Sequence, residues 1–283
     1  MLLKNLKSLE MWIGEKTHHL LSDYLRALKK GEITDEKIQS LKDEMTQEMT
    51  KEFELSKNRD YSTYDRDQKF GLSEHYYGEN IDKRLQESID RVMNNLDVFI
   101  ASKWHEKVEH YFKSAKSTYI ENPRERNFDG MKVSLSHIPA LKDINVMASP
   151  DFGVVFGDDK YLIIDWKTGQ EKMENDGITD QLKIYALKLL LKSHLDIEKT
   201  DIEAYEVYLP SLHSFGWKIT KSDIDAIIKK LVEDVDYQKQ FLVDGDVYKN
   251  IPVAHTEFPR TKSSKKCKTC TLRKACEDLK GIE

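Results

Sequence analysis

Two aspartates and a lysine near the middle of the chain are the residues best suited to chemistry. In the stretch IIDWKTGQ, residues 163–170, an apolar segment leads into Asp165 and Lys167. A third charged residue, Asp151, precedes Asp165 by 13 intervening residues. Charged side chains are costly to bury without partners, so these residues must be paired with one another or with a ligand.

These residues are predicted to meet at the open end of a β-hairpin. The segment SPDFGVVFGDDKYLIIDWKTG, residues 149–169, has a turn signal, GDDK, between two apolar runs. Folded symmetrically about that turn, the hairpin pairs residue 165 near residue 152, so Asp151 and Asp165 meet to within one residue of register. Strand alternation places Asp165 and Lys167 on one face and Trp166 on the other.

This arrangement predicts a site for a hard divalent metal ion, Mg²⁺ or Mn²⁺. Two adjacent carboxylates repel each other unless a cation lies between them, and such ions accept carboxylate and carbonyl oxygens while keeping waters. We expect Asp151, Asp165 and the Trp166 carbonyl to be ligands, and Lys167 to orient a metal-bound water that attacks a phosphoryl group. A lone D-x-K is more often a solvated ion pair, but Pro150, the hairpin register and the following Thr-Gly favour the metal site.

The order of these residues resembles the signature of the PD-(D/E)XK nucleases, and the form DWKTG resembles their RecB-like branch. Gln181 and Tyr185, in DQLKIYAL, match the Q-x3-Y motif of that branch and follow Lys167 by 14 residues. The resemblance implies an α/β, restriction-endonuclease-like core with a central mixed sheet flanked by helices. It also implies metal-dependent hydrolysis of DNA, in which Gln181 and Tyr185 contact the DNA backbone and support the active site.

The RecB-like branch further implies a histidine metal ligand on an early helix, in a G-x3-H context. Gly14 and His18 have this spacing, and an apolar helical pattern follows them. His105 is closer in sequence to the hairpin but lacks the glycine. We therefore favour His18 over His105 as a metal ligand, and we expect His19 and His110 to be surface or packing residues.

Three cysteines, Cys267, Cys270 and Cys276, form a C-x2-C-x5-C pattern near the end of the chain. The spacing resembles the last three cysteines of an iron–sulfur variant of this branch, found in AddB and CRISPR-associated RecB-like exonucleases. There a fourth cysteine lies upstream of the motif histidine, and this sequence has none. Four interpretations stay open: a fourth ligand from an upstream segment, a lost cluster, a zinc site completed by His255, or three free thiols. We expect the three sulfur atoms to lie close together. The surrounding residues 260–274 carry seven positive charges and no acid, as in a solvated tail or a phosphate-contacting patch.

The elements that must position these residues divide the chain into three predicted parts. Residues 1–115 have apolar positions every three or four residues, which predicts a helical region with the motif histidine and an insertion. Residues 116–250 form the predicted nuclease core, with helices at 178–195 and 221–243. Residues 251–283 are predicted to form an irregular, basic, cysteine-bearing tail that packs back on the core.

Shorter signals within these parts predict individual elements. The runs MKVSLSHI, DFGVVFG, KYLIIDWK and EAYEVYLP are rich in β-branched and aromatic residues and are predicted strands. Gly31, followed by Thr34 and Asp35, predicts the end of one helix and the start of another. Residues 57–71 are predicted to be a polar connection.

Composition limits the class of protein. The 283 residues are 39% hydrophobic and 34% charged, with a net charge of −5, as expected for a soluble globular protein. No apolar run approaches the ~20 residues that span a bilayer, and the N-terminus is too charged for a secretory signal. Cysteines confined to the last 17 residues do not form a secreted disulfide framework, so we expect a cytoplasmic protein without membrane partners.

The expected function is metal-dependent cleavage of DNA, exonuclease-like on single strands or ends, in DNA repair, CRISPR or phage defence. The expected partners are DNA and a helicase or other subunit of such a complex. One alternative is a non-catalytic nucleic-acid-binding subunit on the same fold, against which the intact Asp151, Asp165 and Lys167 argue. The other is a zinc-stabilised interaction module, in which the cysteines would matter and the hairpin acids would not.

Overall fold

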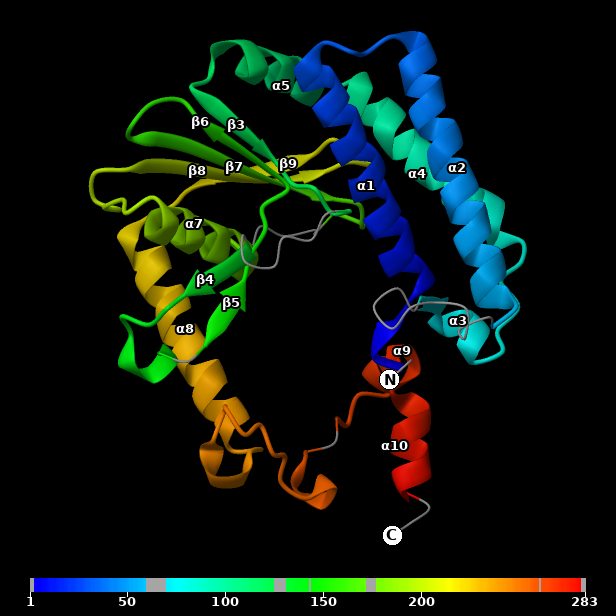
Figure 1. Ribbon diagram of the computed structural model, residues 1–283, viewed down its shortest axis with the longest axis vertical. Helices are drawn as coiled ribbons and strands as arrows, with labels where there is room; N and C mark the ends of the chain where they lie inside the picture. Colours follow the sequence, from blue (N-terminus) through cyan, green and yellow to red (C-terminus); the bar gives the residue numbers. More distant parts are fainter. Residues whose placement is uncertain are drawn as a thin grey trace. The chain divides into compact units, whose positions relative to one another are not determined.

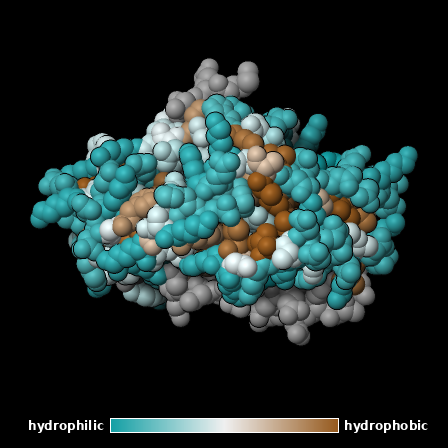
Figure 2. All heavy atoms as spheres, turned by 90° about the horizontal axis from the view of Figure 1, so that it is seen from above, coloured by the Kyte–Doolittle hydropathy of each residue, from teal (hydrophilic) through white to brown (hydrophobic). Residues whose placement is uncertain are grey.

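A computed structural model describes residues 3–59, 70–124, 131–142, 144–171, 177–259 and 261–280 (Figure 1). The chain forms two compact units, one of Met1–Ser102 with Arg260–Glu283 and one of Lys103–Pro259. Hydrophilic residues cover most of the face drawn in Figure 2, in keeping with the high fraction of charged residues. None of the helices in the described ranges is long and apolar enough to cross a membrane.

The first unit is built mainly from helices, as predicted. In chain order its elements are η1 (Leu3–Asn5), β1 (Leu6–Lys7), α1 (Leu9–Lys30), α2 (Asp35–Lys57), β2 (Gly71–Leu72), α3 (Ser73–Tyr76), α4 (Arg84–Ile100), α9 (Ser264–Thr269) and α10 (Arg273–Lys280). Most of the predicted polar connection at 57–71 lies outside the described residues.

Capping residues set the break between the two longest helices. Gly31 ends α1 in the left-handed region at φ 74°, where its N–H donates to the carbonyl oxygens of the preceding turn. The side chain of Thr34 accepts a hydrogen bond from the Lys37 N–H and so caps the start of α2. Such a cap contributes about 1 kcal/mol to stability. The helix break predicted from Gly31 and Thr34 is confirmed.

The C-terminal segment is helical rather than irregular. Ser263 caps α9 by accepting a hydrogen bond from the Lys266 N–H, which explains why a polar, lysine-rich sequence begins a helix there. The segment joins the first unit because the Tyr77 hydroxyl donates to the Thr271 carbonyl at 2.8 Å and the Arg273 guanidinium lies 3.6 Å from the Tyr77 ring centre. The sequence predicted an irregular tail over 251–283 that packs on the nuclease core; residues 251–259 do lie in the second unit, whereas the helices that follow lie in the first.

A five-stranded mixed sheet organises the second unit. The strand order is β3-β6-β7-β8-β9; β7 and β8 are parallel and the other neighbours are antiparallel. This central mixed sheet with flanking helices confirms the predicted restriction-endonuclease-like α/β fold. The unit's elements are α5 (Lys103–Ser114), β3 (Ser117–Ile120), β4 (Lys132–Ser134), η2 (Pro139–Leu141), β5 (Asn145–Met147), β6 (Phe152–Val155), β7 (Lys160–Lys167), α7 (Asp180–Lys192), β8 (Asp201–Tyr208), β9 (Ser214–Lys218), α8 (Lys221–Lys239), η3 (Val243–Gly245) and η4 (His255–Glu257).

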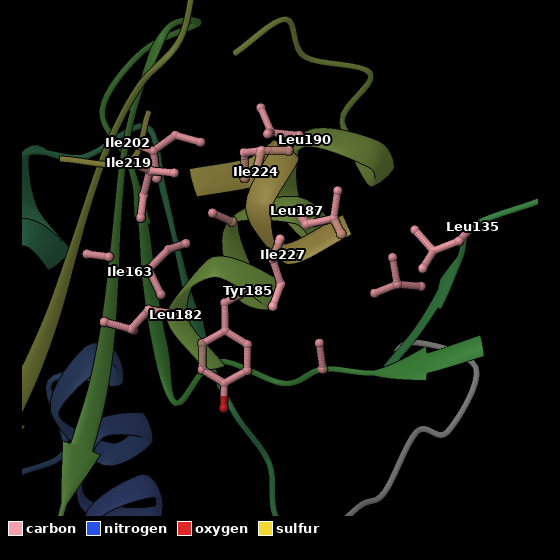
Figure 3. Packing of buried hydrophobic residues seen from close by; sticks show 14 of the residues in the cluster. Leu135, Ile163, Leu182, Tyr185, Leu187, Leu190, Ile202, Ile219, Ile224 and Ile227 are labelled. Carbon is pink, nitrogen blue, oxygen red and sulfur yellow. The ribbon is translucent and has the colours of Figure 1, made fainter. Parts of the chain in front are cut away.

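Helices cover both faces of this sheet. An apolar cluster joins β7 and β8 to α7 and α8, and Figure 3 shows Ile163 and Ile202 of the strands facing Leu182 and Leu187 of α7. Each such buried aliphatic side chain contributes about 1.5–3 kcal/mol. On the opposite face, Trp104 of α5 contacts Trp166 and Tyr205. Because α5 packs on the sheet, it belongs to the second unit and not to the helical region predicted to extend to residue 115.

The predicted hairpin is present, with its register displaced by one residue. Strands β6 and β7 pair Phe152 with Ile164, whereas symmetric folding placed residue 152 opposite 165. The shift moves Asp151 into the position directly opposite Asp165, so the two acids meet as expected. Among the described strands of this unit, β3, β5 and β9 were not predicted, because their short runs lack the sustained alternation on which sequence assignment depends.

Candidate active site

Four carboxylates form a row across one end of the sheet. Extending the observed registers by one pair places Glu121 opposite Asp151 and Asp151 opposite Asp165, and Asp165 itself pairs with Glu206. The Glu121 N–H donates to the Asp151 carbonyl at 2.9 Å, which supports this extension. Directly paired residues project to the same face, so the row faces α7, on the side of Ile163.

The two central acids are both buried. The side chain of Asp151 accepts a hydrogen bond from the Trp166 N–H at 2.7 Å, and this contact fixes the carboxylate at the end of β7. Asp151 is 9% exposed and Asp165 is 3% exposed. Strand alternation places Asp165 and Lys167 on the face toward α7, as predicted. The Trp166 ring lies on the opposite face of the sheet, where it contacts Trp104 and Phe152.

Lys167 connects this row to α7. Its ammonium forms an ion pair with Asp165 Oδ2, donates to Gln181 Oε1 at 2.7 Å and lies 3.8 Å from Glu206 Oε1. The Gln181 amide nitrogen donates in turn to Asp165 Oδ1 at 3.2 Å and to the Tyr185 hydroxyl at 2.6 Å. Gln181 and Tyr185 are four residues apart on one helix face, so α7 presents both to the acids at once.

Tyr185 bridges the apolar core and the acidic row. Figure 3 shows its ring beside Leu182, with the hydroxyl oxygen pointing away from the cluster. Burial raises the pKa of this hydroxyl far above its usual range, and the charges of Asp165 and Asp151 raise it further. Tyr185 therefore stays protonated and can act as a hydrogen-bond donor to a negatively charged group.

Lys188, one turn further along α7, is a second cation at this end of the sheet. Its ammonium donates to the Ala148 carbonyl at 2.6 Å. Burial lowers the pKa of Lys188 to about 8, and the nearby Lys192 lowers it too, while Glu121 acts in the opposite direction. The sequence signal for Lys188 was weak, because lysines are common on the helices of this chain, α7 itself having two others.

The central residues fit a hard divalent ion by the chemistry of their donors. Two buried carboxylates from adjacent strands supply the oxygen ligands that Mg²⁺ and Mn²⁺ prefer. In a β-strand the N–H and C=O of one residue point toward the same neighbouring strand. Because the Trp166 N–H donates to the Asp151 side chain, the Trp166 carbonyl also faces the side of Asp151. Within the described ranges no three His, Cys, Asp or Glu side chains converge as a metal site. An ion held by Asp151 and Asp165 would complete its shell with this carbonyl and with waters.

The two candidate histidines lie on different units. His18 is on α1 of the first unit, whereas the carboxylates belong to the second, and its proposed role as a ligand stays a prediction. His105 is on α5, which packs against Trp166 on the face opposite Asp165. His19 is buried 3.8 Å from both Glu15 and Glu48, as expected of a packing residue.

The cysteines do not form the predicted cluster. Cys267 lies in α9, Cys270 follows that helix and Cys276 lies in α10, and all three are free and exposed. Among the described side chains these thiols belong to no group that could hold a metal ion. An iron–sulfur or zinc centre at these residues therefore has no support in the structure. The side chain of His255 lies outside the described residues.

Sequence reasoning missed Glu206, which lies within the site. It is 2% exposed, accepts hydrogen bonds from Thr179 Oγ1 at 2.9 Å and from the Tyr208 hydroxyl at 3.3 Å, and pairs with Asp165 in register. Burial and the charge of Glu206 raise the pKa of Tyr208 to about 12. A signal was present, because Glu206 occupies an inward position on a strand whose other inward residues, such as Ile202, are apolar.

A comparison with protein families agrees with this geometry. A model of the PD-(D/E)XK nuclease superfamily matches residues 4–277. No curated protein matches the chain. Members of this superfamily are hydrolases that cleave nucleic acids, and they typically use a divalent metal such as Mg²⁺. The match spans nearly the whole chain and includes the buried acids and the lysine, so the chain belongs to the PD-(D/E)XK nuclease superfamily.

Proposed function

We propose that this protein is a metal-dependent deoxyribonuclease of the RecB-like branch. The observation that carries the proposal is the set of contacts among Asp165, Lys167, Gln181 and Tyr185 at one end of the sheet, with Asp151 held opposite Asp165 by the Trp166 N–H. A binding subunit without catalysis has no need to bury two carboxylates against a lysine, since burying charges opposes folding.

In this proposal Asp151, Asp165, the Trp166 carbonyl and His18 hold Mg²⁺ or Mn²⁺. The metal ion, when bound, acidifies a water and polarises a phosphoryl oxygen. The Lys167 ammonium lies beside Asp165, where it orients the attacking water and offsets the negative charge that grows on the phosphorus oxygens.

The Q-x3-Y pair supports this lysine and the DNA. Gln181 holds Lys167 and Asp165 through opposite ends of its amide, so the relative position of acid and lysine depends on this side chain. Tyr185, which stays protonated, donates a hydrogen bond toward the DNA backbone. Both residues come from one turn of α7, and this rigid element keeps the lysine and the phosphate in a fixed geometry.

We further propose exonuclease-like action on single strands or ends, in DNA repair, CRISPR or phage defence, with a helicase or other subunit as partner and in the cytoplasm. This part rests on the likeness of DWKTG and of Q-x3-Y to the RecB-like branch. The three cysteines could join such a complex through an iron–sulfur or zinc centre only with a ligand from outside the group, since three thiolates do not complete a tetrahedral site.

The test is cleavage of end-labelled single-stranded, duplex and circular DNA, with RNA of the same sequence as a further arm. We expect cleavage of linear single strands with Mg²⁺ or Mn²⁺ and none with EDTA. Lys167→Ala should abolish it, while Lys160→Ala, on the same strand but at the turn end, should cleave as the wild type does. Equal activity in the Lys167→Ala and wild-type proteins would refute the mechanism. Cleavage of RNA alone would refute the substrate class.

A further inference from the structure

Glu206 is a buried carboxylate that the nuclease signature does not account for. Its side chain lies on β8 beside Asp165, with Oε1 3.8 Å from the Lys167 ammonium and 2.9 Å from Thr179 Oγ1. Only 2% of the residue is exposed, so its charge is shielded from solvent. A buried carboxylate is retained at a cost to folding, which calls for an explanation in terms of its neighbours.

The need for a second acid follows from the partners of Lys167. The ammonium is paired with Asp165, a residue that the proposed function assigns to the metal ion. A divalent ion on Asp165 would attract that carboxylate and repel the lysine. Gln181 is neutral and cannot offset this repulsion. Glu206 is the neighbouring carboxylate of Lys167 on the next strand, away from Asp151, so its charge stays available to the ammonium when the metal is bound.

Glu206 also touches the start of α7. Thr179 is the residue before the first turn of that helix, and its hydroxyl donates to Glu206 Oε1. The same turn carries Gln181, which accepts the hydrogen bond of Lys167. Glu206 can therefore affect the position of Lys167 in two ways. Its charge attracts the ammonium directly, and its hydrogen bond to Thr179 fixes the start of α7, which carries Gln181. Substitutions can separate these two effects.

We propose that Glu206 is a positioning residue whose buried charge holds the Lys167 ammonium beside Asp165 in the metal-loaded enzyme. The inference rests on the proposed nuclease function, and it adds a third acid to a site whose signature names two. Thr179 and Tyr208 orient the carboxylate by donating to its two oxygens.

The first experiment tests the charge of Glu206 separately from its hydrogen bond with Thr179. Glu206→Gln removes the charge but keeps an acceptor for Thr179, whereas Thr179→Val removes the hydrogen bond but keeps the charge. Glu203→Gln is a matched control on the opposite face of β8. We expect Glu206→Gln to lower kcat by about 10- to 100-fold, as for the loss of one preorganised electrostatic contact. KM for DNA and the affinity for Mn²⁺ should change less than about threefold, because Glu206 touches neither in this proposal.

Thr179→Val should lose less than about fivefold in kcat, the size expected for one neutral hydrogen bond, and Glu203→Gln should match the wild type. The proposal is overturned if Glu206→Gln keeps kcat within twofold of the wild type. It is also overturned if Thr179→Val loses as much as Glu206→Gln, because the carboxylate would then act through α7 and not through the ammonium.

A second experiment does not depend on cleavage. Melting temperatures of Lys167→Met, Glu206→Gln and the double variant, measured in EDTA, form a double-mutant cycle. Lys167→Met leaves Glu206 without its cation, so adding Glu206→Gln should recover part of the lost Tm, by a few degrees. Additive shifts would overturn the pairing. A wild type that cleaves no nucleic acid would refute the proposed function, and this cycle would still decide whether Glu206 and Lys167 are coupled.

Discussion

Lys16 on α1 and Lys167 on β7 are both held between carboxylates, but the first cluster is closed and the second is open. The Lys16 ammonium lies 2.5 Å from Glu48 and 2.6 Å from Glu52, and the lysine is only 2% exposed. Trp12 donates its ring N–H to the other oxygen of Glu52. The side chain of Lys167 keeps 27% of its surface exposed and faces a row with more acids than cations.

The difference shows what a local excess of one charge means. On two packed helices, residues four apart on α1 meet residues four apart on α2, so each donor finds an acceptor and the cluster only stabilises packing. At the end of the sheet, Asp151, Asp165 and Glu206 project to one face because neighbouring strands are in register, and Lys167 forms ion pairs with two of them, Asp165 and Glu206. In our proposal this group of buried acids, beside the partly exposed Lys167, is where the divalent cation binds.

The largest effect should come from breaking the open cluster. We expect Asp165→Ala to lower the rate of DNA cleavage by about 10³-fold or more, since it removes both a proposed metal ligand and a partner of Lys167. Asp158→Ala, in the exposed turn of the same hairpin, is the matched control and should retain activity. In EDTA the Asp165→Asn protein should melt within a few degrees of the wild type, because the substitution relieves repulsion among the acids but also removes the ion pair with Lys167. A loss of folding in this variant would contradict the comparison.

Breaking the closed cluster should act on stability instead. Lys16→Met leaves Glu48 and Glu52 without their buried cation, so we expect the free energy of unfolding to fall by about 3 kcal/mol. Lys29→Met, at the exposed end of the same helix, should change it by less than about 0.5 kcal/mol. Denaturant titration measures both. A smaller loss in Lys16→Met than in Lys167→Met would reverse the assignment of the two clusters.

A histidine on the helix of Lys16 tests whether the first unit takes part in the chemistry. We expect His18→Ala to weaken Mn²⁺ binding and cleavage by about 10- to 100-fold, within the range seen when a metal site loses a supporting group. His105→Ala should have a mild effect, because α5 packs on the opposite face of the sheet. Calorimetric titration with Mn²⁺ separates binding from turnover, and equal affinities in His18→Ala and wild type would remove His18 from the site.

Lys188 offers an intermediate case, a half-buried lysine near the acidic row. Because burial lowers its pKa to about 8 in the folded protein, the unfolded chain binds the extra proton between about pH 8 and its usual pKa of 10.5. Wild-type stability should therefore rise over this range relative to Lys188→Met, and any advantage of the variant should be greatest below pH 8. Melting temperatures across pH measure this, with Lys199→Met as the exposed control. A difference independent of pH would contradict it.

The smallest effect is expected at the cysteines. Because Cys267, Cys270 and Cys276 are exposed and belong to no metal-holding group among the described residues, replacing all three by serine should change cleavage less than about twofold. Iron, sulfide and zinc analysis of anaerobically purified protein completes the test. Stoichiometric iron or zinc would show that a ligand from elsewhere closes a site here, and it would give the first unit a metal centre of its own.

Local patterns in the sequence were enough to predict the hairpin and the side chains at its mouth. Apolar alternation and the GDDK turn depend on residues close in the chain, so Asp151, Asp165 and the opposite placement of Trp166 followed from them, with one residue of register in error. The helix break at Gly31 followed from capping chemistry for the same reason. The Q-x3-Y pair was found only through its resemblance to the RecB-like branch, because an i, i+4 pair on a helix is by itself no sign of a site.

Tertiary structure alone decided which residues join that site from elsewhere. Glu206 meets Lys167 because β8 lies parallel to β7 after the crossover through α7, and such a pairing leaves no turn signal in the sequence. The assignment of α9 and α10 to the first unit likewise depends on Tyr77 and Arg273, which are far apart in the chain. The sequence by itself determined which groups could do chemistry. Long-range strand pairing determined that Glu206, the acid proposed to hold Lys167 in place, lies beside that lysine.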